Sequence, residues 1–389
     1  MLKRDIQEIL SELVATYPVV VITGPRQSGK TTLAKSFFST YHYCNLEDPD
    51  IRMLALTDPR SFFRQYSPPL IIDEVQRVPQ LFSHIQVMAD ELGQNGQFVL
   101  TGSQNLNLNQ HIGQSLAGRA AIVTLLPFSV NELKQVEGME LQRDRLIYTG
   151  FLPRIHHHHQ QPTIAYRNYL QTYVERDVRQ LVNVRDLIVF EKFLRILAGR
   201  VGQLLNMSTL ASDTGVSVTT IAHWISVLEA SYIVFRVPPY FKNIGKRLIK
   251  SPKLYFVETG LAAYLLGIEN EKQVARDPLL GHLFENMIVA DVLKSRLNSG
   301  FDAGNIFFYR DSQHHEVDLL IKKGSNFIPV EIKAAETFHP EFEKNILQFR
   351  KIEANVDEAY LVYSGNYAFN TPDGTKVIPF DRLDEMVRG

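Results

Sequence analysis

Short apolar runs alternate with longer mixed segments between residues 17 and 128, and each run ends at Gly, Asp or Pro. This alternation is typical of β-α-β units, in which helices cover both faces of a parallel sheet. We expect five strands, at residues 19–23, 42–46, 70–72, 98–101 and 120–125. The pattern therefore predicts an α/β core with a parallel sheet in the first third of the chain.

The periodicity changes after this core. Apolar residues recur at helical spacing within residues 131–198, which predicts a helical lid. Residues 199–250 contain a helix, a turn at Gly215 and a second helix with Ile221, Trp224 and Leu228 on its inner face, an order that predicts a winged-helix-like domain. Strand-like runs then return. The predicted α/β multidomain protein has a core at 1–130, a lid at 131–198, a winged-helix-like domain at 199–250 and a further α/β domain at 251–389.

The strongest motif follows the first predicted strand. Gly24, four further residues and then Gly29-Lys30-Thr31 fit the G-x-x-x-x-G-K-[ST] phosphate-binding template in full. Glycines let the backbone curl so that its N–H groups and a helix N-terminus face phosphates. Lys30 would contact the β- and γ-phosphates of ATP, and the Thr31 hydroxyl would ligate Mg²⁺. The expected nucleotide-binding residues are Gly24, Pro25, Arg26, Gln27, Ser28, Gly29, Lys30, Thr31 and Thr32.

Later strands end in polar residues that suit the same reaction. Asp73 is expected to hold the Mg²⁺ shell and Glu74 to polarise the attacking water. Ser103, after the next strand, would sense the γ-phosphate, or it would cap a helix or strand instead. Arg119 would act as an arginine finger in a neighbouring subunit's site, or it would only cap a strand. These residues predict an ATPase, and the finger predicts a homo-oligomer.

Taken together, these motifs resemble a bacterial and archaeal group of AAA-type P-loop ATPases whose C-terminal region is a domain of unknown function. The motifs are GPRQSGKTT from Gly24, YCNLEDP from Tyr43, IDEVQ from Ile72, LTGS from Leu100, SLAGR from Ser115 and LPFS from Leu126. The resemblance covers nearly the whole chain. It implies an additional-strand P-loop fold, a winged-helix segment and a C-terminal fold similar to restriction endonucleases.

A second set of charged residues lies near the C-terminus. Residues 314–333 read as a β-hairpin, and the period of two places Glu331 and Lys333 on one face of a strand. The hairpin would bring Asp318 to Glu331 as a site for Mg²⁺ or Mn²⁺ beside Lys333, which would orient a nucleophile. Glu285, on an amphipathic helix, would complete the site. The pattern is that of PD-(D/E)XK nucleases and is similar to archaeal Holliday-junction resolvases; the alternative is an ordinary charged hairpin.

Three functions follow from these motifs. The first is a MgATP-dependent ATPase that acts on DNA, such as a branch, and binds or cuts it with the C-terminal domain. The second is a signalling or defence switch whose C-terminal domain recognises a ligand without cutting. The third is a scaffold that only holds nucleotide. The basic stretch 242–253, with five Lys or Arg and no acidic residue, favours DNA as a partner. The alternative is that the helix-turn-helix segment only packs against other domains and the basic stretch is a solvated loop.

The composition of the chain bears on its cellular location and on how it could bind nucleic acid. The 41 basic and 42 acidic residues give a formal charge of −1, so attraction to nucleic acid must come from local patches. The one cysteine, Cys44, forms no internal disulfide, which favours a reducing compartment. The apolar runs are shorter than a spanning helix needs. We therefore expect a cytoplasmic protein with no membrane segment and no signal peptide.

Overall fold

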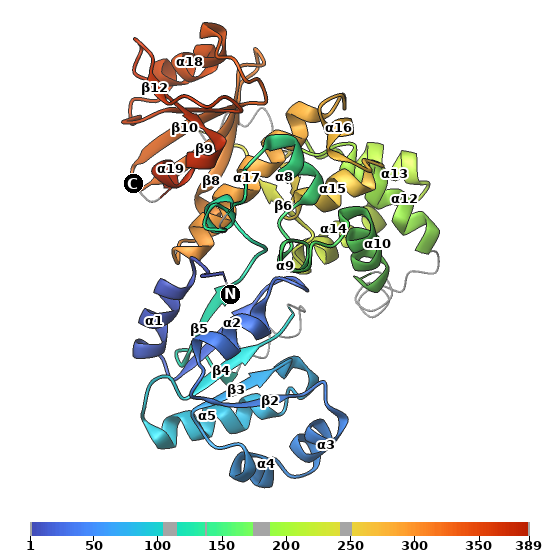
Figure 1. The fold of residues 1–389 in the computed structure, drawn as a ribbon, viewed down its shortest axis with the longest axis vertical. Helices are drawn as coiled ribbons and strands as arrows, with labels where there is room; N and C mark the ends of the chain where they lie inside the picture. The colour runs from blue at the N-terminus through green and yellow to red at the C-terminus, as the bar shows by residue number, and fades with distance from the viewer. Residues whose placement is uncertain (1, 104–114, 137, 174–186, 242–250, 388–389) are drawn as a thin grey trace. The chain divides into compact units, whose positions relative to one another are not determined.

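The computed structural model describes residues 2–103, 115–136, 138–173, 187–241 and 251–387 (Figure 1). The chain divides into two compact units. Unit 1 contains residues 1–128, 230–232 and 296–301, and unit 2 contains residues 129–229, 233–295 and 302–389. We describe each unit by itself.

Unit 1 is built on a five-stranded sheet in the order β2-β3-β4-β1-β5, and every neighbouring pair of strands is parallel. The strands are β1 (Val19–Thr23), β2 (His42–Asn45), β3 (Leu70–Asp73), β4 (Phe98–Thr101) and β5 (Ala120–Thr124). The helices are α1 (Gln7–Thr16), α2 (Lys30–Phe37), α3 (Pro49–Thr57), α4 (Pro59–Gln65), the 3-10 helix η1 (Val75–Arg77) and α5 (Leu81–Leu92). The predicted parallel sheet is confirmed, and each of the five strands lies within one residue of its predicted bounds.

Both faces of this sheet are buried, because alternate strand residues belong to different hydrophobic clusters. Val19, Ile72 and Leu100 pack in one cluster with residues of α3, α4 and α5. Val20 and Ile71 pack in the other cluster with residues of α1 and α2. The result is a three-layer α/β/α core. In such a sheet ligands bind at the carboxyl ends of the strands, and β1 and β3 carry the predicted phosphate-binding and acidic residues there.

Unit 2 begins with helices, as the pattern predicted for residues 131–198. They are α7 (Val130–Lys134), α8 (Arg143–Thr149), α9 (Pro153–His158), α10 (Pro162–Tyr173) and α12 (Leu187–Ala198). The helix-turn-helix segment follows, with α13 (Met207–Thr214), a left-handed turn at Gly215 (φ 80°) and α14 (Val218–Ala230). Ser217 caps α14, since its hydroxyl accepts from the backbone N–H of Thr220 at 3.1 Å. The predicted inner face, Ile221, Trp224 and Leu228, is buried.

A short antiparallel pair comes next, β6 (Val234–Val237) with β7 (Lys253–Phe256). It leads into α15 (Thr259–Leu265), α16 (Glu271–Val274) and the long α17 (Leu280–Asn298). The winged-helix-like domain stays a prediction. Residues 242–250, most of the predicted basic stretch, and residues 174–186 of the predicted lid lie outside the described residues.

The last part of unit 2 is a mixed six-stranded sheet in the order β12-β13-β11-β10-β9-β8. Its strands are β8 (Ile306–Arg310), β9 (Glu316–Lys323), β10 (Asn326–Lys333), β11 (Tyr360–Tyr363), β12 (Phe369–Asn370) and β13 (Lys376–Pro379). The remaining helices are η4 (Ala303–Asn305), η5 (Pro340–Glu343), α18 (Lys344–Ile352), η6 (Phe380–Arg382) and α19 (Asp384–Val387). Strands β8, β9 and β10 are antiparallel, whereas β11 runs parallel to β10. The predicted hairpin is therefore confirmed as β9 and β10.

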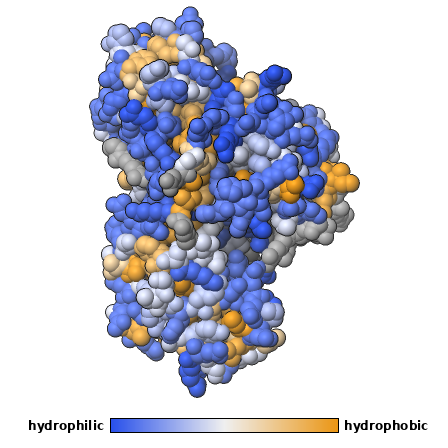
Figure 2. Space-filling view, viewed as in Figure 1, coloured by the Kyte–Doolittle hydropathy of each residue, from blue (hydrophilic) through white to orange (hydrophobic). Residues whose placement is uncertain are grey.

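On the face drawn in Figure 2, hydrophilic residues predominate and hydrophobic residues appear as patches among them. Among the described residues, no helix is both long enough and apolar enough to cross a membrane.

Candidate functional site

The loop between β1 and α2 has the backbone that its glycines predict. Gly24 has φ 143° and Gly29 has φ 93°, values that L-residues with a side chain rarely adopt. A Cβ atom on Gly24 would lie 2.1 Å from the backbone oxygen of Leu125, so only glycine fits there. Gln27 also has positive φ, at 61°. The loop thus curls back over the end of β1, as phosphate binding requires.

Lys30 and Thr31 open α2, so the positive end of that helix lies at the loop. The Lys30 side chain is 7% exposed, and its Nζ donates to the backbone oxygens of Gly24 at 3.0 Å and Pro25 at 2.7 Å. Pro25 and Ser28 are buried, Arg26 is half-buried, and Gln27 and Thr32 are exposed. The ammonium therefore lies within the loop, where β- and γ-phosphate oxygens can replace the two carbonyl acceptors.

Asp73 ends β3 and is surrounded by hydroxyl groups. Its Oδ2 accepts from Thr31 Oγ1 at 2.9 Å and from Tyr43 OH at 2.9 Å, and its Oδ1 accepts from Thr101 Oγ1. Burial and the adjacent Asp73 charge raise the pKa of Tyr43, so this phenol stays protonated and remains a donor. The three hydrogen-bond donors of Asp73 are all hydroxyl groups, which fix the orientation of the carboxylate. Thr31 and Asp73, the two predicted Mg²⁺ residues, are thus brought together, and a hydroxyl beside a carboxylate suits this hard cation.

Glu74 and Ser103, the predicted base and γ-phosphate sensor, are connected by a third residue. Gln76 Nε2 donates to Glu74 Oε2 at 2.5 Å and to Ser103 Oγ at 3.3 Å. Glu74 has a left-handed backbone, with φ 57° and ψ 44°, which turns the chain sharply between β3 and η1. Residues from the ends of β3 and β4 are therefore linked by one amide.

Arg119 lies at the other edge of the sheet. It immediately precedes β5, whereas the phosphate-binding loop follows the end of β1, and β5 is parallel to β1. Its guanidinium pairs with Asp90 of α5 through Nε at 2.5 Å and Nη2 at 2.8 Å. The structure therefore does not bring Arg119 to Lys30 within one chain, and a role as a finger for another subunit stays a prediction.

The hairpin in unit 2 brings three predicted residues together. Val330 pairs with Leu319, so Glu331 and Asp318 occupy the next facing position. Lys333 Nζ lies 3.7 Å from Glu331 Oε1 and 3.8 Å from Asp318 Oδ2. Asp318 Oδ2 also accepts from the backbone N–H of Ile332 at 2.9 Å. Two carboxylates and an ammonium thus meet at the end of the hairpin, as the strand period predicted.

Burial sets the charge of this pair. Desolvation and the adjacent Asp318 raise the pKa of Glu331 well above its ordinary value. Burial also acts to raise the pKa of Asp318, but the ammonium groups of Lys333 and Lys253 outweigh it and lower that pKa. Because two adjacent buried carboxyls resist being ionised together, Glu331 holds a proton while Asp318 is ionised.

Glu285 was predicted to complete this site, and its direct partners are different. Lys253 Nζ donates to Glu285 Oε1 at 2.8 Å, and Tyr255 OH donates to the same oxygen at 2.6 Å. Lys253 Nζ also lies 2.5 Å from Glu316 Oε1, whose other oxygen lies 3.2 Å from Arg310 Nη1. Burial raises the pKa of Glu285 to about 7.

Lys253 corrects one sequence-based expectation. It was counted with the basic stretch 242–253 that was expected to face DNA, yet it is 3% exposed and is held between Glu285 and Glu316. Burial alone would lower the pKa of Lys253, but Tyr255, Glu285 and other nearby acids raise it well above the ordinary value. Lys253 is therefore a buried cation of the acidic cluster and not part of an exposed basic surface.

Within the described residues, no group of three or more His, Cys, Asp and Glu side chains has the arrangement of a metal site. The C-terminal residues fit a divalent cation only as the pair of Asp318 and Glu331. One observation supports that fit, since Glu331 Oε2 is buried and has no hydrogen-bond partner in the described part of the chain. A cation bound there would use this oxygen and take the place of the proton on Glu331.

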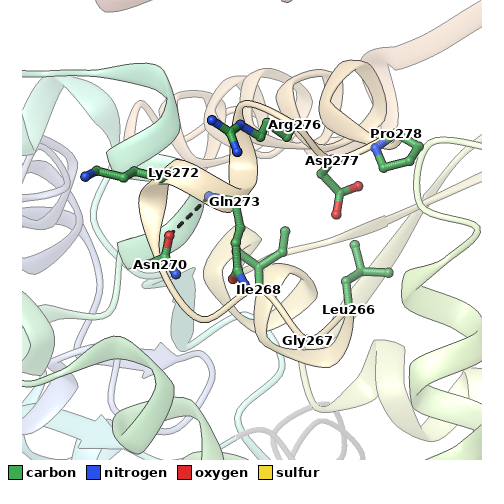
Figure 3. Close-up of a pocket in the computed structure, with 9 residues that line it drawn as sticks. All are labelled: Leu266, Gly267, Ile268, Asn270, Lys272, Gln273, Arg276, Asp277 and Pro278. Carbon is green, nitrogen blue, oxygen red and sulfur yellow. Dashed lines mark hydrogen bonds between the residues drawn. The ribbon is translucent and has the colours of Figure 1, made fainter.

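A separate pocket of about 440 Å³ lies in unit 2 beside α16 (Figure 3). Its lining includes Gln273, Asp277 and Pro278. The Lys272 side chain extends away from the other lining residues. None of the predicted site residues lines this pocket, so it belongs to neither site.

Sequence reasoning missed four residues of these sites, namely Tyr43, Gln76, Thr101 and Lys253. Tyr43 and Gln76 were quoted only as letters of a motif. Thr101 ends β4 two residues before Ser103, so the end of that strand was the available signal. Lys253 gave no local signal, because its partners lie 32 and 63 positions later in the chain.

Comparison with known proteins gives partial matches along the chain. Residues 16–134 match the AAA domain model. Residues 140–272 and 280–383 match two different domains of unknown function. An uncharacterised protein of Mycobacterium tuberculosis is 29% identical over 384 residues, which covers 98% of this chain and 84% of that protein. An uncharacterised protein of Haemophilus influenzae is 24% identical, covering 81% of this chain and 82% of its own length.

Among solved structures, a Walker-type ATPase of Pyrococcus abyssi has 15% identity and a TM-score of 0.46, with 67% of this chain and 94% of that chain covered. Similarity at that level carries no weight for the fold. The AAA match does carry weight, because residues 16–134 include the loop whose geometry suits phosphate binding. This chain is an ATP-hydrolysing enzyme with an AAA-type P-loop domain at residues 16–134.

Proposed function

We propose that this ATPase acts on DNA, and that its C-terminal domain binds a divalent cation and handles phosphodiesters. The observation that carries the proposal is the meeting of Asp318, Glu331 and Lys333 at the end of the β9–β10 hairpin, with Lys333 Nζ within 3.8 Å of both carboxylates. Such a group is costly inside a sheet, because buried charges are unfavourable unless they are paired or bind a metal. A role in binding a cation would explain why these charged residues are buried there.

The chemistry of the three side chains suits phosphodiester cleavage. Asp318 and Glu331 would hold Mg²⁺ or Mn²⁺, which lowers the pKa of a bound water and stabilises the charge that develops on the phosphate. Lys333 is 30% exposed at its side chain, so it is close to both carboxylates and still reaches solvent. It would orient the attacking water or a phosphate oxygen.

Contact with DNA would involve the helix-turn-helix segment. Thr219, His223 and Ser226 are exposed on the outer side of α14, where such residues meet a groove in DNA-binding proteins. These side chains are short or neutral, so the affinity would have to come from basic residues elsewhere. A steep loss of DNA affinity with added salt would support this contact.

A second function is favoured by a specific observation, the compensation of the acidic residues by lysines. Lys253 neutralises Glu285 and Glu316, and Lys333 lies between Asp318 and Glu331. A site already neutralised in this way has less need of a divalent cation. The alternative is therefore an ATP-dependent signalling or defence switch, whose C-terminal domain recognises a ligand and cuts nothing.

One experiment separates the two functions. Wild-type protein, Asp318→Ala and Lys333→Met are incubated with Mn²⁺ and branched, linear or single-stranded DNA. Cleavage by wild type and not by Asp318→Ala or Lys333→Met supports the DNA-acting function. Lys322→Met is the matched control, because it removes a half-buried lysine from β9 at the turn end of the same hairpin. If every DNA stays intact with all four proteins, the nuclease part of the proposal is wrong.

Metal binding gives a second readout that does not need a DNA substrate. A cation at Asp318 and Glu331 must displace the proton on Glu331, so Mn²⁺ binding should release a proton and become tighter as the pH rises. Calorimetry in two buffers with different ionisation enthalpies measures the release. Asp318→Ala should abolish it, and equal binding by wild type and Asp318→Ala would contradict the site.

We also propose that the protein forms a homo-oligomer in which Arg119 contacts the nucleotide of a neighbouring subunit. The support is its place at the start of β5, away from its own Lys30, with a half-buried guanidinium held by Asp90. Mixing Arg119→Ala with Lys30→Ala protein tests it. Partial recovery of ATPase activity in the mixture supports an Arg119 that acts in the site of a neighbouring subunit. A mixture no more active than the two variants measured separately contradicts it.

A further inference from the structure

Gln76 occupies a position between two residues of the ATPase site. Its side-chain Nε2 donates one hydrogen to Glu74 Oε2 at 2.5 Å and the other to Ser103 Oγ at 3.3 Å. Glu74 follows β3 and Ser103 follows β4, and these strands are neighbours in the sheet. The amide therefore spans the ends of two strands and contacts the proposed base and the proposed γ-phosphate sensor together.

The orientation of this amide follows from its partners. A carboxylate only accepts hydrogen bonds, so the NH₂ group and not the carbonyl of Gln76 must face Glu74. That choice leaves Gln76 Oε1 buried with no hydrogen-bond partner among the described residues. An unpaired buried oxygen is unfavourable. This arrangement does not favour stability, because it leaves one polar atom unpaired. The two N–H contacts therefore point to a functional role.

We propose that Gln76 is a positioning residue for ATP hydrolysis, which holds Glu74 and Ser103 in fixed relation. This inference rests on the proposed roles of those two residues. Both hydrogens of the amide are used in the bridge. Ser103 accepts from Gln76, so its own O–H is available to donate to a γ-phosphate oxygen. The bridge contacts Oε2 of Glu74, which leaves Oε1 to accept a proton from water.

In the proposed reaction Glu74 is the proton acceptor. The attacking water transfers a proton to Glu74 as its oxygen forms a bond to the γ-phosphorus. The bond from that phosphorus to the bridging oxygen breaks, and its electron pair stays on ADP. Because Gln76 ties the base to the residue at the γ-phosphate, the water is held between them at the distance the reaction needs.

The test is a double-mutant cycle on Gln76→Met and Ser103→Ala, since methionine keeps the length of the side chain and removes its donors. Gln76→Met should lower kcat about ten- to a hundredfold while the affinity for ADP stays unchanged. Ser103→Ala should cost much less in the Gln76→Met background than in wild type, because the pair acts together. Gln80→Met, at an exposed glutamine just before α5, is the matched control.

A binding measurement supplies a readout other than turnover. The affinity for a non-hydrolysable ATP analogue, divided by that for ADP, should fall about threefold or more in Gln76→Met, because Ser103 is no longer held for the γ-phosphate. Unchanged ADP affinity shows that the variant is folded. An unchanged ratio, strictly additive effects in the cycle or a raised basal rate would each overturn the inference.

A wrong role for Glu74 can be distinguished from a wrong role for Gln76. If Glu74→Gln retains wild-type turnover, Glu74 is not the base and its proposed role is wrong. If Glu74→Gln is inactive and Gln76→Met turns over normally, only the role of Gln76 is wrong.

Discussion

The two acidic sites of this protein stabilise their carboxylates in opposite ways. In unit 1, Asp73 accepts hydrogen bonds from the hydroxyls of Thr31, Tyr43 and Thr101, which carry no positive charge. In unit 2, Glu285 is paired with the ammonium of Lys253, a cation that cancels its charge. Hydroxyl groups orient a carboxylate and leave it able to bind a metal cation. A lysine ammonium instead occupies the position that a metal cation would take.

This difference bears on how the two sites work. At the proposed unit 1 site the Thr31 hydroxyl already contacts the Asp73 carboxylate, so only Mg²⁺ with its nucleotide would have to bind. At the proposed unit 2 site a divalent cation would have to compete with the nearby Lys333 and with the proton that the raised pKa of Glu331 favours. We therefore expect substitutions in unit 1 to act mainly on turnover and substitutions in unit 2 to act first on stability.

The largest expected effect is on turnover in unit 1. Lys30→Ala removes the ammonium that lies within the phosphate-binding loop, and ATP hydrolysis should fall by a factor of about 10³ or more, since this charge stabilises the transferred phosphoryl group. Release of phosphate measures it. Lys272→Ala, an exposed lysine in unit 2, is the control and should keep wild-type turnover. Residual hydrolysis close to wild type in Lys30→Ala would mean that the loop is not the site.

The next effect is on stability in unit 2. Lys253→Met leaves Glu285 and Glu316 without their shared cation, and breaking a buried ion pair costs about 3 kcal/mol or more. Urea unfolding followed by a probe in unit 2 measures the loss. It should be smaller at pH 5 than at pH 8, because Glu285, whose pKa is already raised to about 7, takes up a proton.

Lys322→Met is the matched control for this change and should shift the unfolding midpoint little. Equal midpoints for Lys253→Met and wild type would show that the carboxylates are not compensated by Lys253. The comparison between the two sites would then lose its basis.

The ATPase half of the molecule could be read from the sequence because its signals are local. A glycine-rich loop, a lysine and a threonine follow one another in nine residues, and the apolar runs around them give strands β1 to β5 within one residue of their observed ends. The hairpin was predictable for the same reason. Its period of two placed Asp318, Glu331 and Lys333 correctly relative to one another.

What the sequence could not supply is the pairing of distant residues. Lys253 looked like one more member of a basic stretch, and only tertiary packing places it between α17 and β9. For the same reason the sequence did not indicate that Lys253 and Tyr255 are the immediate partners of Glu285. Gln76 was overlooked because glutamine has no charge and fits no motif by itself.

A smaller effect should appear in the pH dependence of stability. Burial raises the pKa of Glu285 from 4.5 to about 7, so between these values the folded protein binds more protons than the unfolded chain. Stability should therefore fall as the pH rises through this window, by up to about 1.4 kcal/mol per pH unit for this group. Glu285→Gln cannot titrate and should give a shallower slope. Part of the pH dependence should remain in this variant, because the pKa of Glu331 is also raised.

Urea midpoints from pH 4.5 to 7.5 measure this slope, with Glu341→Gln as a control at an exposed carboxyl. Parallel curves for wild type and Glu285→Gln would contradict the burial of an uncharged Glu285. The ion pair with Lys253 would then be sufficient to explain how Glu285 is tolerated in the interior.

The smallest effect concerns the hydroxyls of unit 1. Tyr43→Phe removes the phenol that donates to Asp73 Oδ2 and keeps the ring, over which Lys35 Nζ lies at 3.6 Å. Asp73 loses one of the donors that fix its orientation, so the Mg²⁺ concentration for half-maximal ATPase activity should rise about threefold, as expected for one hydrogen bond. Tyr41→Phe removes a nearby hydroxyl that does not contact Asp73 and should change nothing. If Tyr43→Phe lowers the Mg²⁺ requirement instead, the phenol competes with the cation for Asp73, and the hydroxyls would then resemble the lysines of unit 2.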